Sequence, residues 1–132
     1  MAFSGPMEDQ LAIRALNETY CDAVFLRDPV QWGSTWAIDA HWDLMGTQVD
    51  GREAIVGLWT MAMEGFKFVA FFGQISAIEV DGDTATGRVF THEELEMNDG
   101  TERKPIGRYD DRYVRVDGQW YFQERRFKVL RG

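Results

Sequence analysis

The chain has 132 residues, of which 45% are hydrophobic and 14% aromatic, so it can build the core of one domain but not of two. Its net charge of −8 at pH 7 argues against nucleic acids and anionic membranes as partners, because both require clustered Lys and Arg. One cysteine, Cys21, excludes an internal disulfide, and the absence of a signal sequence or a membrane-spanning run leads us to expect a cytoplasmic protein.

Two helices are predicted before the first strand. Residues 7–27 carry a helical stripe of apolar side chains that includes Tyr20, so the Tyr20 ring faces whatever this helix covers and its hydroxyl needs a partner there. Asp28-Pro29 ends this helix, because the residue before proline leaves the α region, and starts a second helix over 29–37. That helix would carry Trp32 and Trp36 one turn apart as an apolar lid.

A short strand and a third helix follow. Residues 41–45 alternate in polarity, which places Trp42 on one face of a strand and Asp43 on the other. The run Asp50-Gly51-Arg52-Glu53 is a capping-box pattern with Asp50 as N-cap, and it predicts a helix over 52–64.

The rest of the chain predicts strands. Alternating runs over 66–80, 84–97, 101–116 and 119–130 are separated by turn sequences, of which Asp117-Gly118 is the strongest hairpin signal. We therefore predict a four-stranded antiparallel meander. Gly73 inside the first run predicts a bulge or bend that would let the sheet curl.

The two faces of the strand over 84–97 differ in character. We place the smaller and more apolar face inward; it comprises Ala85, Gly87, Val89, Thr91, Glu93 and Leu95. His92 then points outward, where a surface or subunit contact is expected and a catalytic role is the weaker alternative.

The last hairpin has a face that mixes rings and charges. A two-residue turn at Asp117-Gly118 sets Tyr113 opposite Phe122, Asp111 opposite Glu124 and Tyr109 opposite Arg126, all on the face that also carries Arg115 and Trp120. This composition is typical of a wall that holds something polar inside an apolar pocket. The alternative is that the charges lie on a solvated rim while the aromatic rings fill the core.

The order of these elements resembles the nuclear transport factor 2-like superfamily and, within it, the SnoaL-like proteins. The residues that carry the resemblance are Tyr20 with Arg27-Asp28, Asp39-Ala40-His41-Trp42, Gly51-Arg52-Glu53-Ala54-Ile55, Ile78-Glu79-Val80-Asp81-Gly82-Asp83-Thr84-Ala85, and Gly107-Arg108-Tyr109-Asp110-Asp111-Arg112 with Asp117-Gly118-Gln119-Trp120. The resemblance covers nearly the whole chain and lies in order and spacing, since no single motif is specific.

The resemblance implies an α+β fold over 1–132: a single SnoaL-like domain in which a cone-shaped, curled antiparallel sheet wraps the N-terminal helices and leaves an internal pocket. It also implies a homodimer through the sheet. Enzymes of this superfamily, such as scytalone dehydratase, bile-acid dehydratase and ketosteroid isomerase, perform acid–base chemistry in that pocket, whereas other members only bind.

The resemblance also implies roles for particular residues. Tyr20 is similar in position to the tyrosine by which ketosteroid isomerase-like members donate to a developing enolate oxygen, and Asp111 falls near their protonated acid partner. Their general base falls at Leu44, which cannot act as one, and the adjacent Asp43 is on the opposite face. Dehydratase-like members often have a histidine in line with Phe71; its absence argues against dehydratase chemistry, because imidazole is the usual base near neutral pH.

Two functions stay open at this point. The first is a cofactor-independent isomerase, hydro-lyase or cyclase acting on a small hydrophobic oxygenated ring compound, with Tyr20 donating to an oxyanion and Asp111, its pKa raised by burial, moving a proton. The expected pocket-lining side chains are Trp42, Phe71, Tyr109, Tyr113, Trp120, Phe122 and Arg126. The second is a noncatalytic binding or dimerisation module in which Asp111 and Arg126 form a buried ion pair that fixes strand register. Neither needs a metal or a cofactor.

Overall fold

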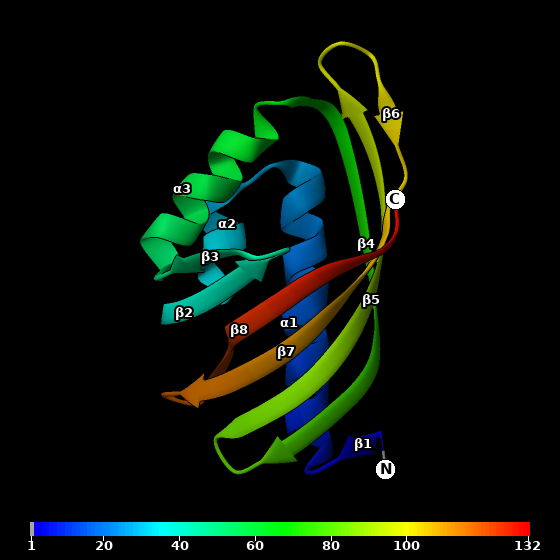
Figure 1. Ribbon diagram of the computed structural model, residues 1–132. Helices are drawn as coiled ribbons and strands as arrows, with labels where there is room; N and C mark the ends of the chain where they lie inside the picture. Colours follow the sequence, from blue (N-terminus) through cyan, green and yellow to red (C-terminus); the bar gives the residue numbers. More distant parts are fainter. Residues whose placement is uncertain (1) are drawn as a thin grey trace.

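A strongly curled, unclosed sheet wraps around one long helix in the computed structural model, which describes residues 2–132 (Figure 1). This part of the chain forms three helices, α1 (Met7–Leu26), α2 (Pro29–Ser34) and α3 (Arg52–Met63). Its strands are β1 (Phe3–Ser4), β2 (Trp36–Leu44), β3 (Thr47–Asp50), β4 (Phe66–Asp81), β5 (Thr84–Met97), β6 (Glu102–Arg103), β7 (Ile106–Val116) and β8 (Gln119–Arg131). Since α1 lies on the concave side of the sheet, the predicted α+β cone is confirmed. None of these helices is long and apolar enough to cross a membrane.

The predicted meander is present as β4, β5, β7 and β8, paired antiparallel in that order. Two parallel pairings were not predicted: β1 joins β4, and β2 joins β8, with β3 beyond β2 at the edge. The sheet is therefore mixed. The predicted strand over 101–116 is interrupted between β6 and β7 by Pro105, which has no N–H for a ladder hydrogen bond.

The second helix ends earlier than the sequence predicts. Its last residue is Ser34, and Trp36 already belongs to β2, so the predicted helix over 29–37 was too long. Long-range pairing explains the difference, because Phe122 N of β8 donates to Thr35 O at 2.8 Å and Trp36 pairs with Phe122. Both tryptophans of the predicted lid are fully buried and belong to the core.

The third helix begins without the predicted capping box. Its N-cap is Gly51, which has a φ of 90° that glycine adopts readily, and no side chain accepts a hydrogen bond there. Asp50 instead ends β3, where its Oδ1 lies 2.6 Å from His41 Nδ1 across the β2–β3 hairpin. The carboxylate that should have capped the helix is used in this pair.

Gly73 allows close packing rather than forming a bulge. A register shift in the β4–β5 pairing falls further along, between Ile75 and Ala77. An added Cβ at Gly73 would lie 3.1 Å from Val89 and 3.3 Å from Asn17 Oδ1, and Asn17 Nδ2 donates to Gly73 O at 3.1 Å. The glycine therefore lets α1 approach the sheet.

A bulge in the last hairpin changes its predicted register. Asp117-Gly118 takes positive φ at both residues, as a two-residue type I′ turn requires, and the pairing is as predicted back to Tyr113. It then shifts by one residue, so Asp111 pairs with Arg125 and not with Glu124. Because side chains alternate between faces, the extra residue turns Arg125 inward, against the prediction.

The predicted ion pair between Asp111 and Arg126 is therefore wrong in its basic partner. Arg125 Nε and Nη2 donate to the two carboxylate oxygens of Asp111 at 2.8 and 3.1 Å, and Tyr113 donates to the same carboxylate at 3.2 Å. Both charged side chains are 0% exposed. Arg126 lies exposed on the outer face of the sheet.

Aromatic rings enclose this ion pair. The Arg125 Cζ lies 3.7 Å from the ring centroid of Tyr109, 4.1 Å from that of Phe122 and 4.6 Å from that of Tyr20. Burial alone would lower the pKa of Arg125, but the attraction of Asp111 raises it above its usual value. The guanidinium is therefore a permanent charge inside the core, and Asp111 neutralises it.

Loss of the Asp111 charge should leave this guanidinium without a counter-ion. We expect Asp111→Asn to lower the free energy of unfolding by about 3–5 kcal/mol, and the double variant Asp111→Leu, Arg125→Met to recover most of that loss because it removes both charges. The matched control is Asp110→Asn, an exposed neighbour, with a change below about 0.5 kcal/mol. Urea unfolding at pH 7 measures all three, and equal losses for Asp111→Asn and Asp110→Asn would contradict the assignment.

Candidate functional site

Tyr20 lies at the centre of an aromatic interior. Its ring centroid is 5.5 Å from those of Trp32, Phe71 and Phe122 and 6.3 Å from that of Trp36. These rings come from α2, β4, β8 and β2, so two elements that follow α1 directly and two that are distant in sequence converge on one residue of α1. All five side chains are buried. The surroundings of Tyr20 are therefore apolar.

Polar groups share this interior with Tyr20. Arg125 stacks on its ring, and Tyr109 accepts a hydrogen bond from Trp42 Nε1 at 3.2 Å. Burial raises the pKa of Tyr20 and that of Tyr109, while the charge of Arg125 opposes the increase in both. Both phenols therefore stay protonated at neutral pH and can donate hydrogen bonds.

The same interior contains hydrogen-bond donors that have no partner. Among residues 2–132, the buried side-chain atoms without a partner are Asn17 Oδ1, Trp32 Nε1, Trp36 Nε1, Thr91 Oγ1 and Arg125 Nη1. All but the Asn17 oxygen carry an N–H or O–H group. Buried donors nearly always have an acceptor, and an unmet one costs about 1–3 kcal/mol. Trp36 Nε1 and Arg125 Nη1 therefore lack an acceptor, and an oxygen atom of a ligand or of water would supply one.

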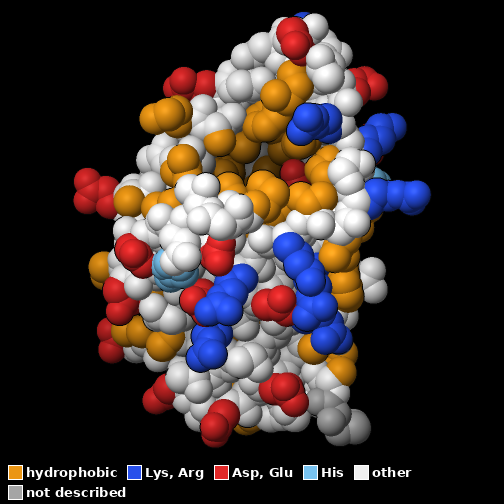
Figure 2. All heavy atoms as spheres, in the orientation of Figure 1, with side chains coloured by type: hydrophobic (Ala, Val, Ile, Leu, Met, Phe, Trp, Pro, Cys, Tyr) orange, Lys and Arg blue, Asp and Glu red, His pale blue; other side chains and the backbone are white. Residues whose placement is uncertain are grey.

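Glu93 is an acidic side chain on the inner face of β5. It pairs with Phe71 of β4, and its neighbours on the same face are the buried Thr91 and the partly buried Leu95. Burial raises the pKa of Glu93 to about 7. Figure 2 shows a recess lined by hydrophobic side chains between α3 and the upper ends of β4 and β5. The sequence predicted that Glu93 faces inward but gave it no role. The signal that could have identified it is an acidic residue at a strand position that faces the core.

Most of the predicted pocket residues do reach the interior. Trp42, Phe71, Tyr109, Tyr113 and Phe122 are buried there. Trp120 is also buried, but it lies beside the start of α1, where its Nε1 donates to Asp9 Oδ1 at 3.1 Å. The structure thus separates Trp120 from the group around Tyr20.

The predicted acidic and imidazole candidates are not brought to Tyr20 as free groups. Burial raises the pKa of Asp111 while Arg125 opposes the increase, and both carboxylate oxygens are used in the ion pair. Asp43 Oδ1 accepts from Gly46 N at 3.0 Å in the turn between β2 and β3. His92 is exposed on the outer face of the sheet, as its strand phase predicts.

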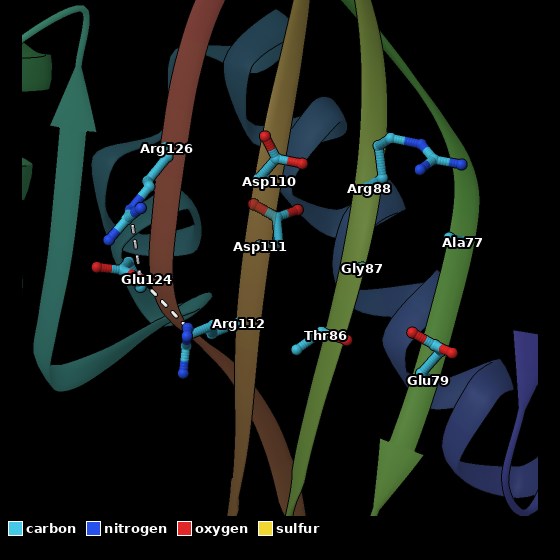
Figure 3. A pocket seen from close by; sticks show the side chains of 10 residues that line it. All are labelled: Ala77, Glu79, Thr86, Gly87, Arg88, Asp110, Asp111, Arg112, Glu124 and Arg126. Atoms are coloured by element: carbon cyan, nitrogen blue, oxygen red, sulfur yellow. Dashed lines mark ion pairs between the residues drawn. The ribbon is translucent and has the colours of Figure 1, made fainter. Parts of the chain in front are cut away.

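Arg126 lines a groove on the outside of the sheet rather than the interior. This polar groove has a volume of about 310 Å³ (Figure 3). Its lining residues are Ala77, Glu79, Thr86, Gly87, Arg88, Asp110, Asp111, Arg112, Glu124 and Arg126. Arg126 Nε is 3.7 Å and Arg112 Nε 3.5 Å from Glu124 Oε1, so these two basic groups share an acidic partner, whereas Arg88 Nε donates to Ser76 Oγ at 3.0 Å.

The interior around Tyr20 is close to solvent through Phe71. None of five surface cavities is lined by Tyr20. However, Phe71 and Thr91 also line a groove of about 560 Å³ beside α1 and β4. Phe71 therefore lies between this groove and the Tyr20 ring, which is 5.5 Å away between ring centroids. Among residues 2–132, no three His, Cys, Asp or Glu side chains are arranged to hold a metal ion.

Solved structures share this fold. An Asp-to-Asn variant of Rv3472 from Mycobacterium tuberculosis, a protein of unknown function, is 27% identical with a TM-score of 0.86 over 96% of this chain and 79% of its own. A protein from Novosphingobium aromaticivorans, provisionally named an aromatic ring hydroxylase, is 25% identical with a TM-score of 0.90 over 98% and 94%. A hexachlorocyclohexane dehydrochlorinase (LinA type 2) is 20% identical with a TM-score of 0.86 over 94% and 86%, which shows the fold alone.

Sequence comparison assigns the family. No curated protein matches the chain. The model of the SnoaL-like domain matches residues 6–126, which is most of the chain. The chain therefore belongs to the SnoaL-like domain family.

Proposed function

We propose that the chain binds a small hydrophobic compound with oxygen substituents between α1 and the curled sheet, and acts on it as a cofactor-independent isomerase, hydro-lyase or cyclase. The observation that carries this proposal is the set of unpartnered donors around Tyr20. Trp36 Nε1 and Arg125 Nη1 are buried, lack acceptors and belong to side chains that pack on the Tyr20 ring. An apolar ring would pack against these aromatic side chains, and its oxygen atoms would accept from these donors.

The comparisons are consistent with chemistry of this kind. One solved structure with the same fold is a dehydrochlorinase, and another is provisionally named a dehydratase; both names describe eliminations that need a proton-transfer group. Tyr20, protonated and buried, would donate to an oxygen that gains negative charge.

A cytoplasmic location, in keeping with the single cysteine, is part of the proposal.

A noncatalytic binding module is the second candidate. Two observations favour it: Asp111 is held in a bidentate ion pair, and Phe71 stands where dehydratase-like members have a histidine. In this case the donors around Tyr20 would bind the ligand, and no proton would move.

We also propose that two copies associate through the outer face of the sheet. Phe68, Phe72 and Phe90 are 52%, 53% and 37% exposed on β4 and β5, and Phe72 packs against Phe25 of α1 at 5.3 Å between ring centroids. Exposed aromatic side chains grouped in this way are typical of an interaction surface.

Ligand binding should depend on the unpartnered indole N–H. The probe is 2-naphthol, a flat apolar compound with one oxygen, titrated by its fluorescence. We expect Trp36→Phe to weaken binding about fivefold, because it keeps an aromatic ring but removes one hydrogen bond of about 1 kcal/mol. Trp120→Phe, which removes a buried indole far from Tyr20, should bind like the original chain. Equal affinity of all three proteins would refute the site.

Association should depend on the aromatic outer face. The original chain should sediment at twice its mass of 15.2 kDa, and Phe72→Glu should sediment as a monomer because a charge would be buried in the contact. Val30→Glu is the matched control, since Val30 is 82% exposed on α2. A monomeric original chain, or dissociation by Val30→Glu alone, would contradict this surface.

A further inference from the structure

Glu93 lies on the inner face of β5, beside residues that reach the surroundings of Tyr20. It pairs with Phe71 across the β4–β5 ladder, and the Phe71 ring lies 5.5 Å from the Tyr20 ring. The preceding residue on the same face, Thr91, is 2% exposed and carries one of the unpartnered donors. Glu93 itself is partly exposed, so it stands between the sealed interior and solvent.

The main chain fixes Glu93 while its carboxyl stays free. Glu93 N donates to Pro105 O at 3.1 Å, which anchors the residue at the start of β7. None of the ion pairs within residues 2–132 includes Glu93. Burial raises its pKa to about 7, so at neutral pH the carboxyl is present in both its acidic and its basic form.

The neighbouring titratable groups cannot take this role. From α1, Tyr20 faces Glu93, and its pKa is raised mainly by burial and further by the charge of Glu93. From β7 and β8, Tyr109 stays protonated and Arg125 is neutralised by Asp111. The next residue along the strand, Glu94, points to the outer face, where it lies 3.7 Å from Lys104.

We propose that Glu93 transfers the proton in this site, and that the substrate is a small ring compound with a C–H bond next to a carbonyl carbon. This inference rests on the proposed function. The carboxylate takes the proton, the C–H electron pair forms a carbon–carbon double bond, and the carbonyl oxygen gains negative charge beside Tyr20. The Glu93 carboxyl then returns the proton, either to another carbon, which gives an isomer, or to a neighbouring hydroxyl, which leaves as water.

Proton abstraction can be measured with 5-nitrobenzisoxazole, without knowledge of the natural substrate. A base removes the proton on carbon, the C–H electron pair forms the additional carbon–nitrogen bond of a nitrile, and the N–O bond breaks with its electron pair left on oxygen as a coloured phenolate. We expect the rate of the original chain to rise with pH through a midpoint near 7, as Glu93 ionises. Glu93→Gln should lower the rate about 100-fold, whereas Glu94→Gln, the adjacent outward acid, should leave it unchanged.

Two further measurements separate this inference from the proposed function. Binding of 2-naphthol to Glu93→Gln at the original affinity, together with loss of the reaction, supports both. If 2-naphthol does not bind but Glu93→Gln still abolishes the reaction, the ligand class is wrong and the role of Glu93 stands. A Glu93→Gln rate equal to that of the original chain, no acceleration by the original chain, or a Glu93 carboxyl that titrates near 4.5 by NMR would overturn the role of Glu93.

Discussion

The buried pair of Asp111 and Arg125 is the interaction on which the rest of this structure depends. Two charges without solvent contact are unfavourable unless they meet in good geometry with further hydrogen bonds, and here two N–H groups and one phenol satisfy the carboxylate. The pair forms because a bulge in the last hairpin turns Arg125 inward. Strand register, the curvature of β8 and the position of the guanidinium are therefore determined together.

The ion pair also organises the aromatic interior. The guanidinium gives Tyr109, Phe122 and Tyr20 a flat cation to pack against, and such contacts are favourable where solvent is absent. Since Asp111 neutralises the guanidinium, the pair adds no net charge to the surroundings of Tyr20. One N–H of Arg125 is left without an acceptor, so the group that stabilises the core also contributes a donor to the site.

Sequence patterns predicted the features that depend on local alternation of side chains. They failed for the features that depend on pairing between distant segments. The stripe of α1, the Asp117-Gly118 turn and the inner face of β5 follow from periods of 3.6 and 2, and all three are present. The bulge could not be predicted, because one extra residue reverses every side chain beyond it and leaves no local mark. Trp36 fits the helical pattern in the sequence, but in the structure it pairs with Phe122 of β8, which is distant in the chain.

The candidate site shows the same contrast. The aromatic side chains around Tyr20 were expected from the sequence, whereas a role for Glu93 was not. Asp111 and Glu93 both face inward, and their surroundings give them different properties: Asp111 is held in an ion pair with Arg125, whereas Glu93 lies opposite Phe71 and forms no ion pair within residues 2–132. Phe71 connects these facts. The resemblance to dehydratase-like proteins implies a histidine in line with Phe71, and Phe71 lies across the ladder from Glu93. Burial raises the pKa of Glu93 to about 7, the range in which an imidazole titrates. The residue that argued against acid–base chemistry at its own position therefore pairs with the acid for which we propose that role.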